Sequence, residues 1–486
     1  MSRPSFPRVA ALKNAAAFRA HLDAGGISLA FDDTLAHGPD SPLGAPLDIG
    51  GVRIGNRFCV LPMEGWDGTR DGQPSPHTRR RWQRFGQSGA KLIWGGEAVA
   101  VRHDGRASPN QLMLNERNHA SIAALREGLV DAHRDRFGSN ADSDLYIGLQ
   151  LTHSGRFSKP NASDRPEPLT AGAHPILDRR VPGDVPILDD DQLDRLVDEF
   201  VVAAGRAASA GFSFVDVKLC HGYLGHELIG ARQRPGRYGG SLENRLRFPR
   251  TIIEGIQAAV PGLQIGVRLS AFDIAPYRKG PDGVGEPDGT LPDDPLVGFG
   301  VLTGENLDTA LDESRALIAM LRDHGIRMIC VTAGSPYYCP HAQRPAFFPP
   351  ADGYLPPEDP LVSVARQIAA TARLKASFPE MTFIGSAYSY LQEWLPNVAQ
   401  YNVREGLTDF VGLGRIVLSY PDLPADVLAG VPLRRGDICR TFSDCTTGPR
   451  LGHISGCYPL DGYYKAMPEA ATILSVRTRL AAGDQR

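Results

Sequence analysis

Eight short and almost continuously apolar runs divide the chain, and segments with helical periodicity separate them. Strands buried on both faces have this composition, as in parallel sheets that are covered by helices. Alternation of strand and helix eight times predicts an α/β fold, a (β/α)8 TIM barrel. The runs are RFCVLP from Arg57, KLIWGG from Lys91, LYIGLQL from Leu145, FSFVDV from Phe212, QIGVRLS from Gln264, RMICVT from Arg327, MTFIGS from Met381 and DFVGLG from Asp409.

Apolar residues between these runs recur at the spacing of one helix face. Asp189 to Asp191 precede the first such pattern and are candidates for its N-cap. The patterned positions are Leu193, Val197, Phe200, Val201 and Ala204 before the fourth run, Leu317, Met320 and Leu321 before the sixth, and Val364, Ile368 and Ala372 before the seventh.

The barrel is predicted over residues 46–425, between an N-terminal extension over 1–45 and a cysteine-containing C-terminal extension over 426–486. Directly after the fifth run, residues 273–306 are rich in Gly, Pro and Asp. A loop of this length follows the strand end where barrels carry their active sites. We expect it to be a lid or a disordered insertion.

Charge excludes some kinds of partner. The 486 residues include 52 basic and 55 acidic side chains, and no stretch gathers Lys and Arg on one face, so a nucleic-acid partner is not expected. No window reaches the roughly 18 apolar residues of a membrane span, and the N-terminus lacks the apolar core of a secretory signal. We expect a cytoplasmic protein with a small-molecule substrate, and a homo-oligomer is left open.

Polar residues end several of the apolar runs. In a (β/α)8 barrel the carboxyl ends of the strands form the active site, so these residues are the candidates for function. They are Gln150 near the end of the third run and His153 after it, Lys218, His221 and Tyr223 after the fourth, Arg268 in the fifth, and Gly414 and Arg415 at the end of the eighth.

The turns after the last two runs, GSAYS and GLGRIV, are small and contain glycine. Their backbone N–H groups can approach a phosphate, and Arg415 can add a charge-assisted pair of hydrogen bonds. An amide from Gln150 and a guanidinium from Arg268 suit a planar heterocycle that carries carbonyl oxygens. Together these residues indicate a flavin mononucleotide (FMN) site.

The chain resembles the Old Yellow Enzyme family of FMN-dependent oxidoreductases. The resemblance is carried in unbroken order, over roughly residues 45–425, by NRFCVLPM, GGEAVAV, LQLTHSGR, CHGYLGHE, RYGGSLENRLRF, GVRLS and GLGRIVLSYPDL. The tandem of HGYL and YGGSLENR is its most specific part. Within the family, the chain is most similar to the larger branch of trimethylamine dehydrogenase and 2,4-dienoyl-CoA reductase, although the sequence ends before their appended nucleotide-binding domains.

The resemblance implies roles for individual residues. His221 and Lys218 bind the substrate carbonyl, and Tyr223 delivers a proton. Arg268 lies near flavin N1 and the C2 carbonyl, and Glu64 lies near the C4 carbonyl and N5. The other cofactor-binding residues are Pro62, Met63, Ala98 and Gln150 on the ring system, and Ala387, Tyr388, Gly414 and Arg415 on the phosphate.

The implied reaction is that of an ene-reductase. NADH or NADPH reduces the flavin, and flavin N5 then transfers hydride to the β-carbon of an activated double bond. Two donors on the carbonyl oxygen stabilise the enolate, and a phenol protonates the α-carbon. Two alternatives stay open: an amine dehydrogenase or demethylase, and a non-catalytic flavoprotein that relays electrons.

Two residues near the flavin depart from the family pattern. Lys218 replaces a histidine, and an ammonium there predicts an anionic or strongly polarised substrate. Glu64 replaces a threonine or cysteine, and a carboxylate at that place is expected to alter the redox behaviour of the flavin.

The C-terminal cysteines are a third departure. Relatives of the larger branch carry four cysteines for a [4Fe-4S] cluster in this region. Here CRTFSDCTTGPRLGHISGC keeps Cys439, Cys445 and Cys457, but Phe442 takes the place of the second ligand. We expect no metal, and a cluster only if Cys339, Asp444 or His453 supplies the fourth ligand.

Overall fold

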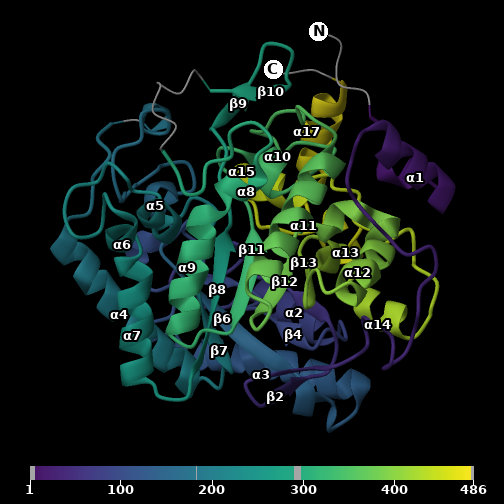
Figure 1. Ribbon diagram of the computed structural model, residues 1–486, viewed down its shortest axis with the longest axis horizontal. Helices are drawn as coiled ribbons and strands as arrows, with labels where there is room; N and C mark the ends of the chain where they lie inside the picture. Colours follow the sequence, from purple (N-terminus) through teal and green to yellow (C-terminus); the bar gives the residue numbers. More distant parts are fainter. Residues whose placement is uncertain (1–5, 182, 289–296, 483–486) are drawn as a thin grey trace.

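A closed barrel of parallel strands forms the centre of the molecule (Figure 1). The computed structural model describes residues 6–181, 183–288 and 297–482. The order of strands β4-β3-β13-β12-β11-β8-β7-β6 is closed by pairing of β4 with β6, and β5 extends the sheet beside β6. The strands are β3 Phe58–Val60, β4 Leu92–Ile93, β5 Ala98–Ala100, β6 Tyr146–Thr152, β7 Phe214–Leu219, β8 Gln264–Ser270, β11 Met328–Thr332, β12 Thr382–Gly385 and β13 Phe410–Leu413.

Each of the eight apolar runs overlaps one barrel strand, so the predicted (β/α)8 fold is confirmed. A separate cluster of buried side chains on and next to the strands forms an inner core of the barrel, among them Trp94, Tyr146, Phe214 and Phe410. An antiparallel hairpin, β1 Leu47–Ile49 with β2 Val52–Ile54, packs against this inner core and covers the end where the strands begin.

Helices surround the barrel (Figure 1). The predicted N-cap is confirmed, because the Asp189 side chain accepts a hydrogen bond from the Gln192 backbone in a capping box, and Ser75 caps α2 in the same way. The longer helices between strands are α2 Pro76–Gly86, α3 His119–Phe137, α4 Asp190–Ser209, α7 Arg247–Ala259, α9 Asp312–Asp323, α11 Pro360–Ser377 and α12 Leu395–Arg404. The other helices before the C-terminal segment are α1 Ala15–Ala24, α5 Leu224–Ile229, α6 Leu242–Arg245, α8 Leu307–Ala310, α10 Pro340–Gln343, α13 Ile416–Ser419 and α14 Leu423–Leu428.

The long segment after β8 is partly regular. Within predicted loop 273–306, β9 Tyr277–Lys279 pairs with β10 Gly285–Pro287 as an antiparallel hairpin. The Tyr277 N–H donates to the Tyr338 carbonyl at 2.7 Å, and the Gly285 N–H donates to the Leu355 carbonyl at 2.9 Å. The prediction of a disordered insertion is therefore wrong for the residues that form this hairpin. Residues 289–296 of the same prediction lie outside the described residues.

The C-terminal segment packs beside the carboxyl ends of the strands. It contains α15 Asp444–Arg450, α16 Gly462–Lys465 and α17 Ala470–Ala482, and α15 and α17 lie at the end of the barrel away from β2 (Figure 1). The Ser455 N–H donates to the Gly65 carbonyl at 3.2 Å, and Arg80 bonds Asp461 at 2.9 Å. These contacts tie the segment to the loop after β3 and to α2.

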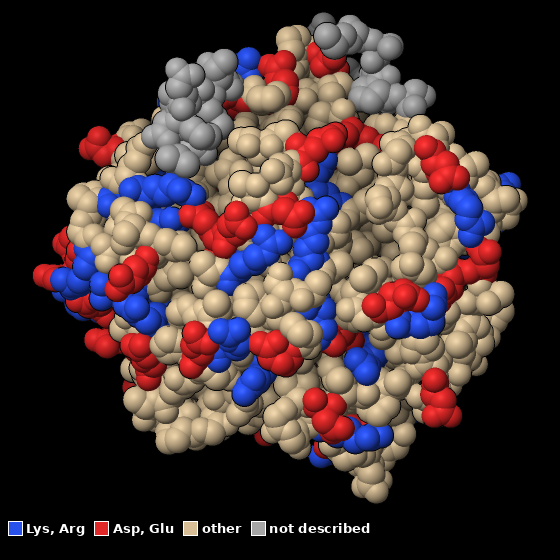
Figure 2. All heavy atoms as spheres, viewed as in Figure 1, with Lys and Arg blue, Asp and Glu red and all other residues tan. Residues whose placement is uncertain are grey.

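Basic and acidic side chains are interspersed on the face seen in Figure 2. Among the described residues, no helix combines the length and the apolar composition that crossing a membrane requires.

Candidate functional site

A cavity of about 250 Å³ opens at the carboxyl ends of the barrel strands. It brings together residues that are far apart in the sequence but that end neighbouring strands. The predicted site residues that line it are Pro62, Met63, Glu64, Gln150, Lys218, His221, Tyr223, Arg268, Ala387, Gly414 and Arg415.

Ala98 and Tyr388 are not among the residues that line the cavity. Ala98 is buried in β5 opposite Gln150, and Tyr388 accepts a hydrogen bond from Asn402 on its phenol oxygen at 2.9 Å. The backbone before Tyr388 is unusual, since Ala387 has φ 74°, the left-handed region. This conformation is expected where a turn presents backbone groups to a ligand.

Glu64 joins three side chains in the cavity. Its Oε1 lies 2.5 Å from the Lys218 ammonium, and its Oε2 accepts from the Tyr223 phenol at 2.5 Å and from the Trp66 indole at 3.1 Å. The Lys218 ammonium also lies 3.7 Å from the centre of the Tyr223 ring. The sequence predicts an anionic or strongly polarised substrate, and because Glu64 balances the charge of Lys218, this charge alone does not favour the anion over the polarised compound.

Tyr223 and His221 are both neutral, and a neutral phenol and a neutral imidazole each carry one proton that can be donated in a hydrogen bond. Burial, followed by the charge of Glu64, raises the pKa of Tyr223 well above its usual value, so the phenol keeps its proton. Burial, followed by Arg268 and Lys218, holds the pKa of His221 well below its usual value, so its ring is neutral. His221 is also in the left-handed region, with φ 68°.

Asp216 is a site residue that the sequence interpretation missed. It is fully buried on β7, and its Oδ2 accepts from Gln150 Nε2 at 2.5 Å and from the Trp94 indole at 2.8 Å. Its Oδ1 accepts from the Arg268 backbone N–H at 2.7 Å. Asp216 thus fixes the Gln150 amide and the strand of Arg268. A charged residue inside the apolar run FSFVDV was the available signal.

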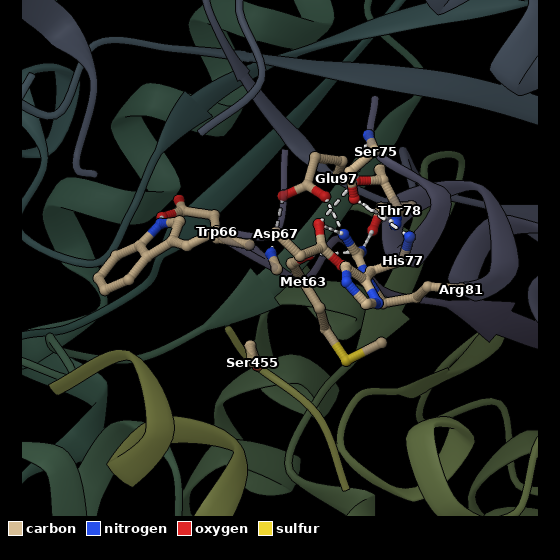
Figure 3. Close-up of polar contacts among 12 residues, drawn as sticks. Met63, Trp66, Asp67, Ser75, His77, Thr78, Arg81, Glu97 and Ser455 are labelled. Atoms are coloured by element: carbon tan, nitrogen blue, oxygen red, sulfur yellow. Dashed lines mark hydrogen bonds and ion pairs between the residues drawn. The ribbon is translucent and has the colours of Figure 1, made fainter. Parts of the chain in front are cut away.

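A second missed group holds the loop that carries Glu64 (Figure 3). Arg81 on α2 donates to Asp67 at 2.8 Å, to Glu97 and to the Met63 carbonyl at 3.1 Å. Glu97 in turn accepts from the Gly65 N–H at 2.9 Å. The backbone on both sides of Glu64 is therefore bonded to one buried cluster, which we call the Arg81 cluster: Asp67, Arg81 and Glu97.

Arginines gather at another part of the cavity wall. Arg344, Arg415 and Arg450 all line it. Arg344 donates to Thr446 at 2.6 Å, and Arg415 donates to the Pro345 carbonyl at 2.5 Å. Burial, followed by the charge of Arg415, lowers the pKa of Arg344. Guanidinium groups so close together indicate a place for an anionic part of a ligand.

Comparison with known proteins identifies the family. Residues 42–284 match the model of the NADH:flavin oxidoreductase / NADH oxidase family. The chain belongs to this family. Among its relatives, NADPH dehydrogenase of Geobacillus sp. (strain WCH70) is 31% identical over 250 residues, which are 49% of this chain and 65% of that protein. Two further NADPH dehydrogenases are covered over 62% and 63% of their length, so the alignments span less than two thirds of these relatives.

Solved structures share the fold. An Old Yellow Enzyme homologue from Zymomonas mobilis aligns with a TM-score of 0.57 and 21% identity, over 80% of this chain and 93% of that one. A 2-naphthoyl-CoA reductase aligns with a TM-score of 0.62 and 18% identity, over 89% of this chain and 58% of that one. At these identities the likeness supports the barrel and nothing further.

The cavity of this family member fits a flavin. Within the described residues, the polar atoms on its lining side chains that are buried without a hydrogen-bond partner include Arg268 Nε, Thr332 Oγ1, Ser386 Oγ and Arg415 Nη1. Buried polar groups are normally satisfied, so these atoms indicate a polar ligand. Arg268 and Gln150 suit ring carbonyls, and Ser386, Gly414 and Arg415 suit a phosphate.

The three C-terminal cysteines are close enough to affect one another. Burial, followed by the charges of Cys439 and Cys445, raises the pKa of the Cys457 thiol. Cys445 also lines the cavity. Phe442, at the place of the missing ligand, packs against the Phe348 ring with centroids 5.3 Å apart.

The three candidates for a fourth ligand lie beside other groups. Cys339 contacts Asp273, Asp444 bonds Arg477 at 2.7 Å, and His453 lines a separate hollow. Among the described residues, no group of three or more His, Cys, Asp and Glu side chains is arranged to hold a metal ion.

Proposed function

We propose that the protein is an FMN-dependent oxidoreductase that takes electrons from NADH or NADPH. Its substrate is an uncharged compound with an activated double bond, such as an α,β-unsaturated carbonyl compound. One observation carries this proposal. The cavity combines partnerless polar atoms suited to a flavin with the neutral phenol of Tyr223 and the neutral ring of His221.

FMN, when bound, supplies hydride transfer between the reductant and the substrate. Gln150 and Arg268 hold the polar edge of its ring system, and Asp216 keeps both in place through hydrogen bonds of 2.5 and 2.7 Å. Arg415, with the backbone of Ala387 and Gly414, holds the phosphate. The preference for FMN over a larger flavin is inferred from the small turns after β12 and β13.

His221 and Lys218 donate hydrogen bonds to the carbonyl oxygen of the substrate, and so stabilise the negative charge that develops there. Tyr223 gives its proton to the substrate α-carbon. Its phenol oxygen is 3.0 Å from that of Tyr337, which offers a path for a replacement proton. Since Glu64 compensates the charge of Lys218, the substrate does not need to be an anion.

Glu64 argues against amine oxidation. A cationic amine needs an unpaired carboxylate in the cavity, whereas the charge of Glu64, the one carboxylate among the described lining residues, is already balanced by Lys218.

Anaerobic flavin spectra test the proposal. Bleaching of the bound flavin by NADH or NADPH, followed by reoxidation with 2-cyclohexenone, is the expected result. Bleaching by an amine instead would establish the dehydrogenase alternative. If neither reductant bleaches the flavin, the proposed activity is wrong and the electron-relay alternative gains support.

A further inference from the structure

Glu64 supplies negative charge to a cavity whose other charged side chains, within the described residues, are cationic. Among the described residues that line the cavity, the cationic side chains are Lys218, Arg268, Arg344, Arg415 and Arg450, and Glu64 is the one carboxylate. Three of the arginines lie near the C-terminal segment or β13, where a phosphate is proposed to bind. The balance of charge beside Lys218 therefore depends on Glu64.

The Lys218 ammonium has little contact with water. Its side chain is 2% exposed and that of Glu64 is 15% exposed. A buried charge that loses its partner is strongly destabilised, because neither water nor another ion replaces the lost interaction. With Glu64 present, Lys218 is a hydrogen-bond donor within a neutral pair. With Glu64 neutralised, Lys218 becomes a buried cation that needs an anion.

The position of Glu64 is fixed from several directions. Its carboxylate is held by Lys218, Tyr223 and Trp66, and Trp66 has φ 45°, a strained conformation for a large residue. The neighbouring backbone is held by the Arg81 cluster, since Arg81 bonds the Met63 carbonyl and Glu97 bonds the Gly65 N–H (Figure 3). Such a network keeps the carboxylate on Lys218.

We infer that Glu64 determines the charge specificity of the substrate site: it makes the cavity accept uncharged carbonyl compounds, reject carboxylates, and use Lys218 as a neutralised hydrogen-bond donor. This inference rests on the proposed function in one respect, which is that the substrate binds beside Glu64 and Lys218. The residue types that relatives place here, threonine and cysteine, carry no carboxylate, so the specificity would belong to this chain's own pair of Glu64 and Lys218.

The test compares two ligands that differ in charge and share a shape. Binding of cinnamamide and of cinnamate is measured by titration calorimetry on the oxidised, flavin-loaded protein, without any reductant. The wild-type protein is expected to bind cinnamamide at least about tenfold more tightly than cinnamate. In Glu64→Gln, the cinnamate affinity is expected to rise at least about tenfold, because the variant keeps the shape and removes the charge.

The double variant Glu64→Gln/Lys218→Gln is the matched control. It is expected to lose the gain in cinnamate affinity, since the cation that attracts the carboxylate is gone. If Glu64→Gln does not fold, Lys218→Gln alone serves instead, and it is expected to weaken cinnamate further relative to cinnamamide because Glu64 is then unpaired.

A wild-type preference for cinnamate, or an unchanged ratio of the two affinities in the single variants, would overturn the inference. Because no nicotinamide is present, a failure of NADH and NADPH to reduce the flavin leaves this result interpretable. Conversely, an unchanged ratio in a protein that does turn over would reject the role of Glu64 and leave the proposed function standing.

Discussion

Asp216 Oδ2 accepts a hydrogen bond of 2.5 Å from Gln150 Nε2, across the neighbouring strands β7 and β6. The carboxyl group lies beneath the cavity, with no exposure to solvent. This contact takes up one of the two N–H donors of the Gln150 amide, and it leaves the second N–H and the amide oxygen for a ligand. Asp216 thus limits what Gln150 can present to a ligand.

Asp216 is expected to make stability depend on pH. Burial raises the pKa of Asp216 from 3.8 to about 6, although Gln150, Trp94 and Arg268 oppose the shift. The folded state then favours the protonated carboxyl, so this contribution to stability is complete below about pH 3.8 and is lost as the pH rises through about 6. The loss is about 3 kcal/mol in the free energy of unfolding.

Urea denaturation at a series of pH values measures this effect. Asp216→Asn keeps the size of the side chain and cannot ionise, so the fall in unfolding free energy between about pH 4 and pH 6 is expected to be smaller in the variant. Equal pH dependence in the two proteins would show that the carboxyl does not titrate in this range.

Tyr223→Phe is expected to separate the two halves of the proposed reaction. Removal of the phenol takes away the proton donor, so reoxidation of the flavin by 2-cyclohexenone should slow by about 10²- to 10⁴-fold. Reduction by NADH or NADPH should change little. Stopped-flow absorbance measures both rates, and an equal loss in both would mean that Tyr223 acts on binding of the flavin instead.

Arg415→Ala is expected to weaken FMN much more than riboflavin. The Arg415 side chain lines the cavity, and its Nη1 has no hydrogen-bond partner within the described residues, so its charge is available to a phosphate. Riboflavin has the same ring system without the phosphate. Fluorescence titration of the flavin-free protein with each ligand gives the two affinities, and equal losses for both would place Arg415 away from the phosphate.

Arg81→Met is expected to destabilise the fold by about 3–5 kcal/mol, since it leaves Asp67 and Glu97 buried without their shared cation. The loop from Met63 to Trp66 should loosen as well. Thermal unfolding measures the first effect. Arg134→Met removes an exposed ion pair with Asp142 and is the matched control, for which little or no change in the unfolding temperature is expected.

Much of the barrel and of the cavity wall could be predicted from the sequence, because strand ends carry local signals. Gln150, Lys218 and Arg268 each end or follow an apolar run, and the structure brings all three to one cavity. Ala98 was predicted on the flavin by resemblance alone, and its side chain is not part of the cavity lining. The domain boundaries at residues 45 and 425 and the cytoplasmic location stay predictions.

The missed residues depend on contacts between distant segments. Arg81 belongs to a helix whose periodicity gives no reason to expect a buried cation, and its partners Asp67 and Glu97 come from two other loops. Tyr337 and Arg344 reach the cavity from the segment after β11, where no strand-end pattern marks them. The pairing of Glu64 with Lys218, over 154 positions of sequence, could not be read from either residue alone.

The anaerobic absorbance spectrum of the purified protein with its bound flavin decides whether this is a flavin-dependent reductase. We predict release of FMN on denaturation, bleaching of the bound flavin by NADH or NADPH, and recovery of the oxidised spectrum on addition of 2-cyclohexenone. A protein that binds no flavin after reconstitution with FMN, or a bound flavin that neither nicotinamide reduces, would contradict this prediction.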